Sequence, residues 1–165
     1  MFTHKKLFFI AGLVWLAIGT SLLTLGIHFI METLRNPVVH LSQPGKFSLL
    51  LFLDSLFSHN RQNTVVVILS TAILAGYMKG KFVLGKSVER HKKRIASLPN
   101  PTSIRYLYTK GYLLLIASMM GLGFLMKVLP ITIDTRGAVD VTIGSALVNG
   151  ATLYFRSLKG FSKAT

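Results

Sequence analysis

Cysteine is absent from the 165 residues of the chain. Disulfides, thiolate metal sites and cysteine nucleophiles are therefore excluded. Carboxylates are scarce as well: five Asp and Glu stand against nineteen Lys and Arg, which gives a formal net charge of +14. Charged residues make up only 15% of the chain, whereas an average soluble domain has about 25%. The five acids are too few and too scattered to indicate a catalytic dyad.

The common catalytic and nucleotide-binding motifs are also missing, because no Walker sequence, no GxSxG and no HExxH occurs in the chain. We therefore predict no catalytic residues, no cofactor and no metal site. A lipid-modifying enzyme is the least favoured of the functions that we consider.

Apolar residues, in contrast, are abundant: 51% of the chain is hydrophobic and the mean hydropathy is +0.55. The basic residues stand at the ends of apolar runs, as topology signals do in membrane proteins. Nucleic-acid binders instead spread basic residues over a polar surface. The sequence therefore predicts an all-α, polytopic membrane protein without a nucleic-acid partner.

The apolar runs predict four transmembrane helices within a single integral membrane domain, residues 1–165. The first run has 25 residues without a formal charge, enough to cross a bilayer with some tilt. The other three are shorter between their charged residues. The predicted spans, arranged as two hairpins, are 7–31, 64–84, 106–130 and 137–155.

Residues 47–57 form a further apolar segment, with Asp54 as its only charged residue. Eleven residues are too few to cross a bilayer as a helix. Serines mark a narrow polar face, so we predict a short interfacial or re-entrant helix. A segment that docks onto a partner protein is the alternative.

The basic residues also predict the orientation of the spans. With the N-terminus in the cytoplasm, fourteen Lys and Arg fall inside and five outside, in agreement with the positive-inside rule. Nine of the fourteen lie in or beside a basic cytoplasmic loop, 85–105, into which the helical pattern of the second span continues as far as about Ser97. We predict that both termini are cytoplasmic, in a bacterial-type inner membrane or an equivalent organelle membrane.

Glycines recur at helical spacing in the first two predicted spans. Gly12, Gly19 and Gly26 are seven residues apart, and Gly76 and Gly80 are four apart. Small residues let membrane helices approach closely, so we assign these five glycines to helix packing. Because a single four-helix unit has little interior, they also favour a homo-oligomer or a subunit of a larger membrane complex.

The fourth predicted span carries a polar face. Its residues follow one another at spacings of 3, 4 and 3, which is one side of an α-helix. Two charged residues four apart, suited to an ion pair, precede them near the start of the span. Such a face either packs against another helix or lines a path for a solute or ion. The candidate ligand or pore-lining residues are Thr142, Ser145, Asn149, Thr152, Asp140 and Arg136.

A basic face precedes the third predicted span. Lys79, Lys86, Arg90 and Lys93 share one side of a helix. They act as topology determinants or form a surface for a partner or for membrane lipids, with anionic headgroups as one option.

Two functions account for these features best. The first is an oligomeric channel or transporter for a small solute or ion, with the polar face of the fourth span along its path. The alternative is a non-catalytic subunit, an assembly factor or a scaffold factor of a larger membrane protein complex.

Overall fold

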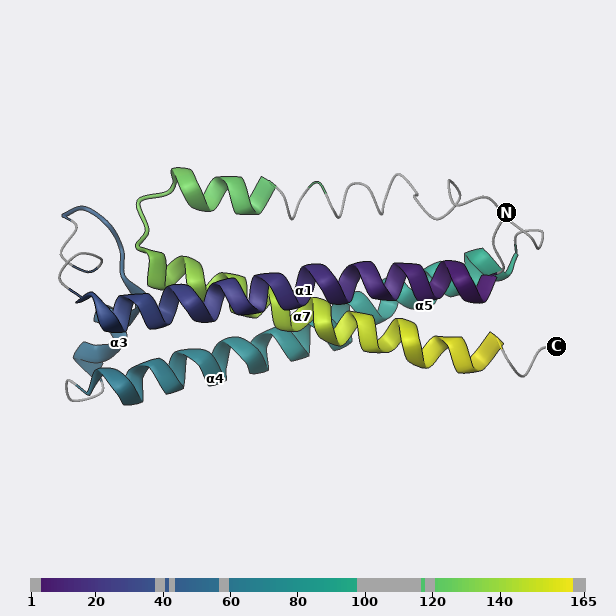
Figure 1. Ribbon diagram of the computed structural model, residues 1–165, viewed down its shortest axis with the longest axis horizontal. Coiled ribbons are helices and arrows are strands. Elements are labelled where there is room, and N and C mark those ends of the chain that lie inside the picture. Colours follow the sequence, from purple (N-terminus) through teal and green to yellow (C-terminus); the bar gives the residue numbers. More distant parts are fainter. Residues whose placement is uncertain are drawn as a thin grey trace.

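A computed structural model shows a protein built on three long helices (Figure 1). Helix α1 spans His4–Arg35, α4 spans Arg61–Lys79 and α7 spans Ile133–Phe161. The structure describes residues 4–37, 41, 44–56, 60–97, 117 and 121–161. Across these ranges the regular structure is helical, apart from one isolated bridge between Phe47 and Ile131. The prediction of an all-α protein is confirmed.

Helix α4 runs without a break into one turn of π-helix, η1 (Gly80–Leu84), and then into α5 (Gly85–Ala96). The backbone N–H of Gly80 donates to the carbonyls of both Gly76 and Tyr77, where the α-helix changes to the wider π-helix. The predicted basic loop is thus helical up to Ala96, because no proline interrupts the pattern before that point.

Three helices are long and apolar enough to cross a membrane: Lys5–Arg35, Arg61–Arg90 and Ile133–Leu158. They contain the predicted spans 7–31, 64–84 and 137–155, and each extends several residues into the polar flanks. The remaining predicted span, 106–130, lies mostly outside the described residues. Of its residues the structure describes Ala117 and 121–130, of which 121–128 are helical.

The neighbours of the glycines give the helix directions. A side chain at Gly12 would meet Tyr154 and Phe155, and one at Gly26 would meet Gly137, so α1 and α7 are antiparallel. Gly76 lies against Ser145 and Gly80 against Asn149, so α4 and α7 run in the same direction. The start of α1, the end of α7 and α5 therefore share one end of the bundle (Figure 1).

Two clusters of buried apolar side chains hold the helices together. One lies near the shared end of α1, α5 and α7, and it includes Phe8, Trp15, Val88 and Tyr154. The other lies toward the opposite end, around Ile30. Large apolar side chains cover much of the outer surface, as expected for helices in contact with lipid. Examples are Ile18 on α1, Leu74 and Met78 on α4, Phe82 on η1, and Phe124.

The predicted interfacial segment forms a shorter helix, α3 (Leu49–Leu56), which packs on the end of the bundle (Figure 1). Leu50 is fully buried in the second apolar cluster. Asp54 is also buried. Its carboxylate is satisfied there, because Thr64 of α4 donates to it and Arg61 forms a salt bridge with it at 3.8 Å. The segment thus docks within its own chain, in addition to any contact with the membrane surface.

Candidate functional site: the contacts of α7

The glycines of α1 lie in its contact with α7. Gly12, Gly19 and Gly26 are all buried there. A Cβ atom built on Gly19 would lie 2.9 Å from the backbone nitrogen of Val148. At Gly26 it would lie 2.6 Å from the carbonyl oxygen of Gly137. At Gly19 and Gly26 only glycine permits the two helices to approach this closely, because a side chain would strike backbone atoms of α7.

Helix α7 supplies matching glycines, which we did not predict from the sequence. A Cβ atom on Gly144 would lie 2.6 Å from the nitrogen of Leu23, and one on Gly137 would lie 2.7 Å from the oxygen of Gly26. Gly137, Gly144 and Ala151 repeat every seven residues, as the α1 glycines do. This shared period was the available signal that the two rows face each other.

The glycines of α4 and η1 lie against the polar face of α7. A Cβ atom on Gly76 would overlap Ser145 Oγ and the carbonyl oxygen of Thr142. On Gly80 it would lie 2.7 Å from the carbonyl oxygen of Ala146. Both rows of glycines therefore contact α7 of the same chain, so they are not by themselves evidence for a second copy of the protein.

One side chain of the polar face donates a hydrogen bond to the backbone of α4, and a second lies against it. Asn149 Nδ2 donates to the carbonyl oxygen of Tyr77 at 3.0 Å, whereas Ser145 Oγ lies 3.4 Å from that of Ile73 and closer, 3.1 Å, to the carbonyl oxygen of Thr142 in its own helix. The Tyr77 carbonyl stands where the hydrogen-bond pattern changes from α to π. The Asn149 amide thus supports a backbone acceptor at the point where the regular ladder is disturbed.

The other polar-face residues bond within α7. Thr142 Oγ1 donates to the carbonyl oxygen of Ala138, and Thr152 Oγ1 donates to that of Asn149. Such back-bonding satisfies a hydroxyl group without a partner helix. Thr142 also borders an apolar groove of about 340 Å³ between α7, η1 and Leu122.

Asp134, at the start of α7, forms a buried network that the sequence analysis did not identify. Its Oδ2 atom accepts from Ser48 Oγ at 3.0 Å and from the backbone N–H of Leu50 at 2.9 Å, and its other oxygen accepts from Thr132. Thr135 Oγ1 accepts from the N–H of Leu49. One carboxylate therefore caps the start of α3 from 84 to 86 residues away in sequence.

The predicted ion pair between Arg136 and Asp140 is not a salt bridge in the structure. The Arg136 guanidinium instead lies over the Phe29 ring of α1, 5.3 Å from its centroid. Among the described residues, Arg61 and Asp54 form the one salt bridge. Asp140 is buried, with 8% of its surface exposed. The aromatic ring explains the difference, because a planar guanidinium stacks well on it.

The four residues of the predicted basic face, Lys79, Lys86, Arg90 and Lys93, are all exposed. Val88 of α5 is buried in the first apolar cluster. One side of this helix therefore packs on the bundle, and its other sides face outward. Basic residues of α1 and α7 lie at the same end of the bundle. Glu89 is the only acid that the structure describes there.

Comparison with known proteins returns no matching family model, no matching curated protein and no matching solved structure. In the described part of the chain, no group of three His, Asp or Glu side chains could hold a metal ion.

Proposed function

We propose that this protein is a non-catalytic subunit or assembly factor of a larger membrane protein complex. One observation favours this function over a channel. The side chains suited to line a path are engaged with α4 in the same chain, where Asn149 donates to the Tyr77 carbonyl and Ser145 packs against Gly76. Opening a path along this face would break the Asn149 bond and separate the closely packed glycine contact.

A four-span topology belongs to this proposal. Helix α5 ends at one end of the bundle and α7 begins at the other, so the chain between them must return along the bundle. The 29 residues of α7 correspond to about 43 Å. A crossing within 106–130 would make this return, and the helical residues 121–128, with Phe124 and Val128 exposed, agree with it.

The orientation also belongs to the proposal. The end that carries α5 is rich in Lys and Arg, whereas Asp54 and Asp134 lie at the end that carries α3. By the positive-inside rule the α5 end would face the cytoplasm. Both termini would then be cytoplasmic, and α3 would lie on the outer side.

Helix α5 offers the docking surface. Its exposed basic residues extend beyond the apolar part of the second span, and the neighbouring cluster around Val88 holds it to the bundle. A rigid helix with one sign of charge suits an acidic surface on a partner membrane protein, because complementary charge steers and orients association.

The proposed function predicts that a triple variant of α5, Lys86→Gln, Arg90→Gln and Lys93→Gln, loses its partner while remaining folded. The measurement is the mass and stoichiometry of complexes purified in mild detergent from native membranes. We expect the wild-type chain in a hetero-complex of fixed composition and the variant as the free chain, with unchanged gel-filtration behaviour.

A control removes the same charge from exposed positions elsewhere: Arg35→Gln, Lys46→Gln and Lys127→Gln. This variant should keep the complex. A closed homo-oligomer of wild-type protein that conducts ions or solutes in liposomes would contradict the proposal and favour the channel.

Substituted cysteines test topology and path together, because the native chain has no cysteine. In intact cells or spheroplasts, Lys46→Cys should react with a membrane-impermeant thiol reagent, whereas Arg90→Cys should react only after permeabilisation. Ser145→Cys and Asn149→Cys should stay unlabelled in both cases, since α4 covers these positions.

The opposite results are equally informative. Labelling of Arg90→Cys from outside would refute the orientation. Rapid labelling of Ser145→Cys or Asn149→Cys by a water-soluble reagent would show a wet path and would support the channel.

A further inference from the structure

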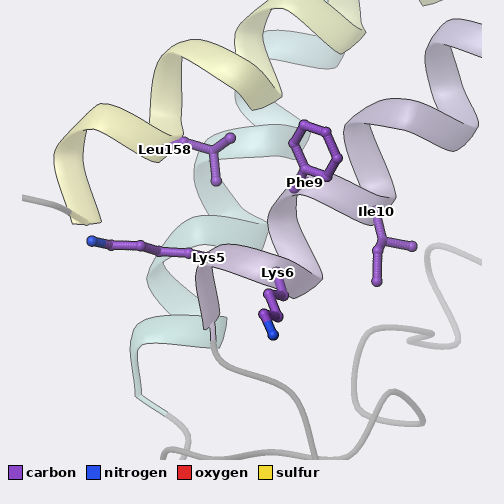
Figure 2. A pocket seen from close by; sticks show the side chains of 5 residues that line it. All are labelled: Lys5, Lys6, Phe9, Ile10 and Leu158. Carbon is purple, nitrogen blue, oxygen red and sulfur yellow. The ribbon is translucent and has the colours of Figure 1, made fainter.

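We propose that the groove between the first turns of α1 and the last turns of α7 binds one anionic phospholipid. Lys5, Lys6, Phe9 and Ile10 of α1 and Leu158 of α7 line this groove, which encloses about 450 Å³ (Figure 2). The inference does not depend on the proposed function, because it concerns a different surface and a lipid rather than a protein.

The residues of α1 that line the groove form two short rows along the helix. Residues four apart lie above one another on a helix. Lys5 therefore precedes Phe9 on one row, and Lys6 precedes Ile10 on the next. Each row has an amine at its outer end and an apolar side chain one turn deeper. An amphiphile with a charged head and a hydrocarbon tail has this same order of groups.

Helix α7 supplies the far wall. Figure 2 shows the Lys5 side chain extended beneath Leu158, with Phe9 on the side of the groove toward α7. The Phe9 ring contacts the ring of Phe155 with centroids 5.7 Å apart, which holds it in position although 49% of its surface is exposed. Phe9, Ile10 and Leu158 can thus cover an acyl chain.

Charge complementarity identifies the headgroup as an anion. Both lysines are exposed, and neither forms a salt bridge with a carboxylate in the described part of the chain. The exposed residue Arg156, two residues before Leu158 on α7, adds further positive charge, with Glu89 as the single described acid at this end. A lysine ammonium is a compact point charge that suits a phosphate oxygen.

The location of the groove selects a lipid over a soluble anion. Lys5 and Lys6 directly precede the 25-residue stretch without formal charge, so their amines would lie at headgroup level while Phe9 and Ile10 lie at the start of the hydrocarbon. A free phosphate ion would use the amines only and leave the apolar wall exposed to water.

Native mass spectrometry of the full chain in a neutral detergent tests the proposal. Titration with phosphatidylglycerol should show one tightly held lipid, and phosphatidylcholine of the same chain length should bind much more weakly. The double variant Lys5→Gln, Lys6→Gln should bind phosphatidylglycerol about 30-fold more weakly, the loss expected for two lysines near an anionic headgroup.

A charge-matched control is Arg35→Gln with Lys46→Gln, on exposed positions at the opposite end of the bundle. This variant should keep the affinity within about threefold, because charges several Debye lengths away are largely screened. An equal loss in both double variants would overturn the site, because it would mean attraction by net charge alone.

Two further variants keep the result interpretable if the glutamine variant fails to fold. Lys5→Arg with Lys6→Arg preserves the charge and should retain the lipid. Leu158→Asn preserves both lysines and should weaken binding, because it places an amide against the acyl chain. Retention of full affinity by Leu158→Asn, or displacement of the lipid by about 10 mM inorganic phosphate (about ten thousand times a lipid concentration of about 1 μM), would overturn the lipid assignment.

Discussion

Gly26→Leu should prevent the folded bundle from accumulating. Even a Cβ atom at Gly26 would lie 2.6 Å from the carbonyl oxygen of Gly137 and 2.7 Å from the nitrogen of Val141. Because these are backbone atoms, α1 and α7 must move apart to admit a leucine. Overpacking of this kind costs typically 1–3 kcal/mol and sometimes more, and here it would also separate the neighbouring contacts of Ile30 and Gly144.

Gly121→Leu is the matched control for this prediction. Gly121 is also a helical glycine, but a Cβ atom there would meet nothing within 4 Å among the described residues. Its replacement should be neutral or favourable, since glycine is a poor helix former by about 1 kcal/mol. Detergent gel filtration and unfolding in increasing SDS measure both variants. Equal unfolding midpoints for the two would contradict the role assigned to Gly26.

The sequence was sufficient to predict the helices and much of their packing. Long apolar runs between basic flanks predicted three helices that the structure contains. The positions of Gly12, Gly19 and Gly26 also indicated a face for close approach, because glycine in a membrane helix has few other structural uses. Local pattern is enough in these cases, since backbone hydrogen bonds within one segment determine the helix.

The residue or helix that each of these side chains contacts could not be predicted in the same way. Glycine spacing marks a close contact but does not say whether the second helix belongs to the same chain, and we therefore linked the glycines to oligomerisation. Arg136 has Asp140 one turn away in sequence, yet it stacks on Phe29 of another helix. Whether a side chain contacts a neighbour in its own helix or a residue of another helix depends on how whole helices pack. The sequence of one segment does not contain this information.

Buried acids show the same limit more clearly. In the sequence, Asp54 is the only charged residue of its apolar segment, and Asp134 stands at the edge of the last predicted span. Both are buried, with 6% and 1% of their surfaces exposed. Two donors to Asp134 lie 84 and 86 residues away, so no periodicity in the sequence could have identified them, and the partners of Asp54 lie across a turn in the next helix. Ser48 just before an apolar run, a typical helix cap, was the nearest available hint.

Asp134→Ala should destabilise the fold by about 2–6 kcal/mol. The change removes the acceptor of Ser48 Oγ and of the Leu50 N–H at once, whereas Thr132 Oγ1 can still donate to the carbonyl oxygen of Phe47. Each buried donor left without a partner costs roughly 1–3 kcal/mol, and the methyl group of alanine offers no replacement acceptor. Because Ser48 and Leu50 belong to the start of α3, the damage should be greatest where α3 joins α7.

Two measurements locate this effect. Unfolding in SDS reports the loss of global stability, and the rate of tryptic cleavage after Lys46 reports local opening, since this exposed lysine lies two residues before Ser48. We expect Asp134→Ala to lower the unfolding midpoint and to speed cleavage at Lys46. Asp134→Asn should be intermediate, because the amide keeps one acceptor oxygen but turns a donor toward groups that already donate.

Glu32→Ala is the appropriate control, since it removes a carboxylate from the same end of the bundle. Glu32 accepts a hydrogen bond of 2.7 Å from the side chain of Asn36, but this pair is exposed and water can replace it. Its loss should change the unfolding free energy by no more than about 0.5 kcal/mol. If Glu32→Ala and Asp134→Ala were equally mild, the Asp134 carboxylate could not be what holds α3 against α7. A large effect confined to Asp134, together with faster cleavage at Lys46, would identify this one carboxylate as the link that holds α3 to the start of α7.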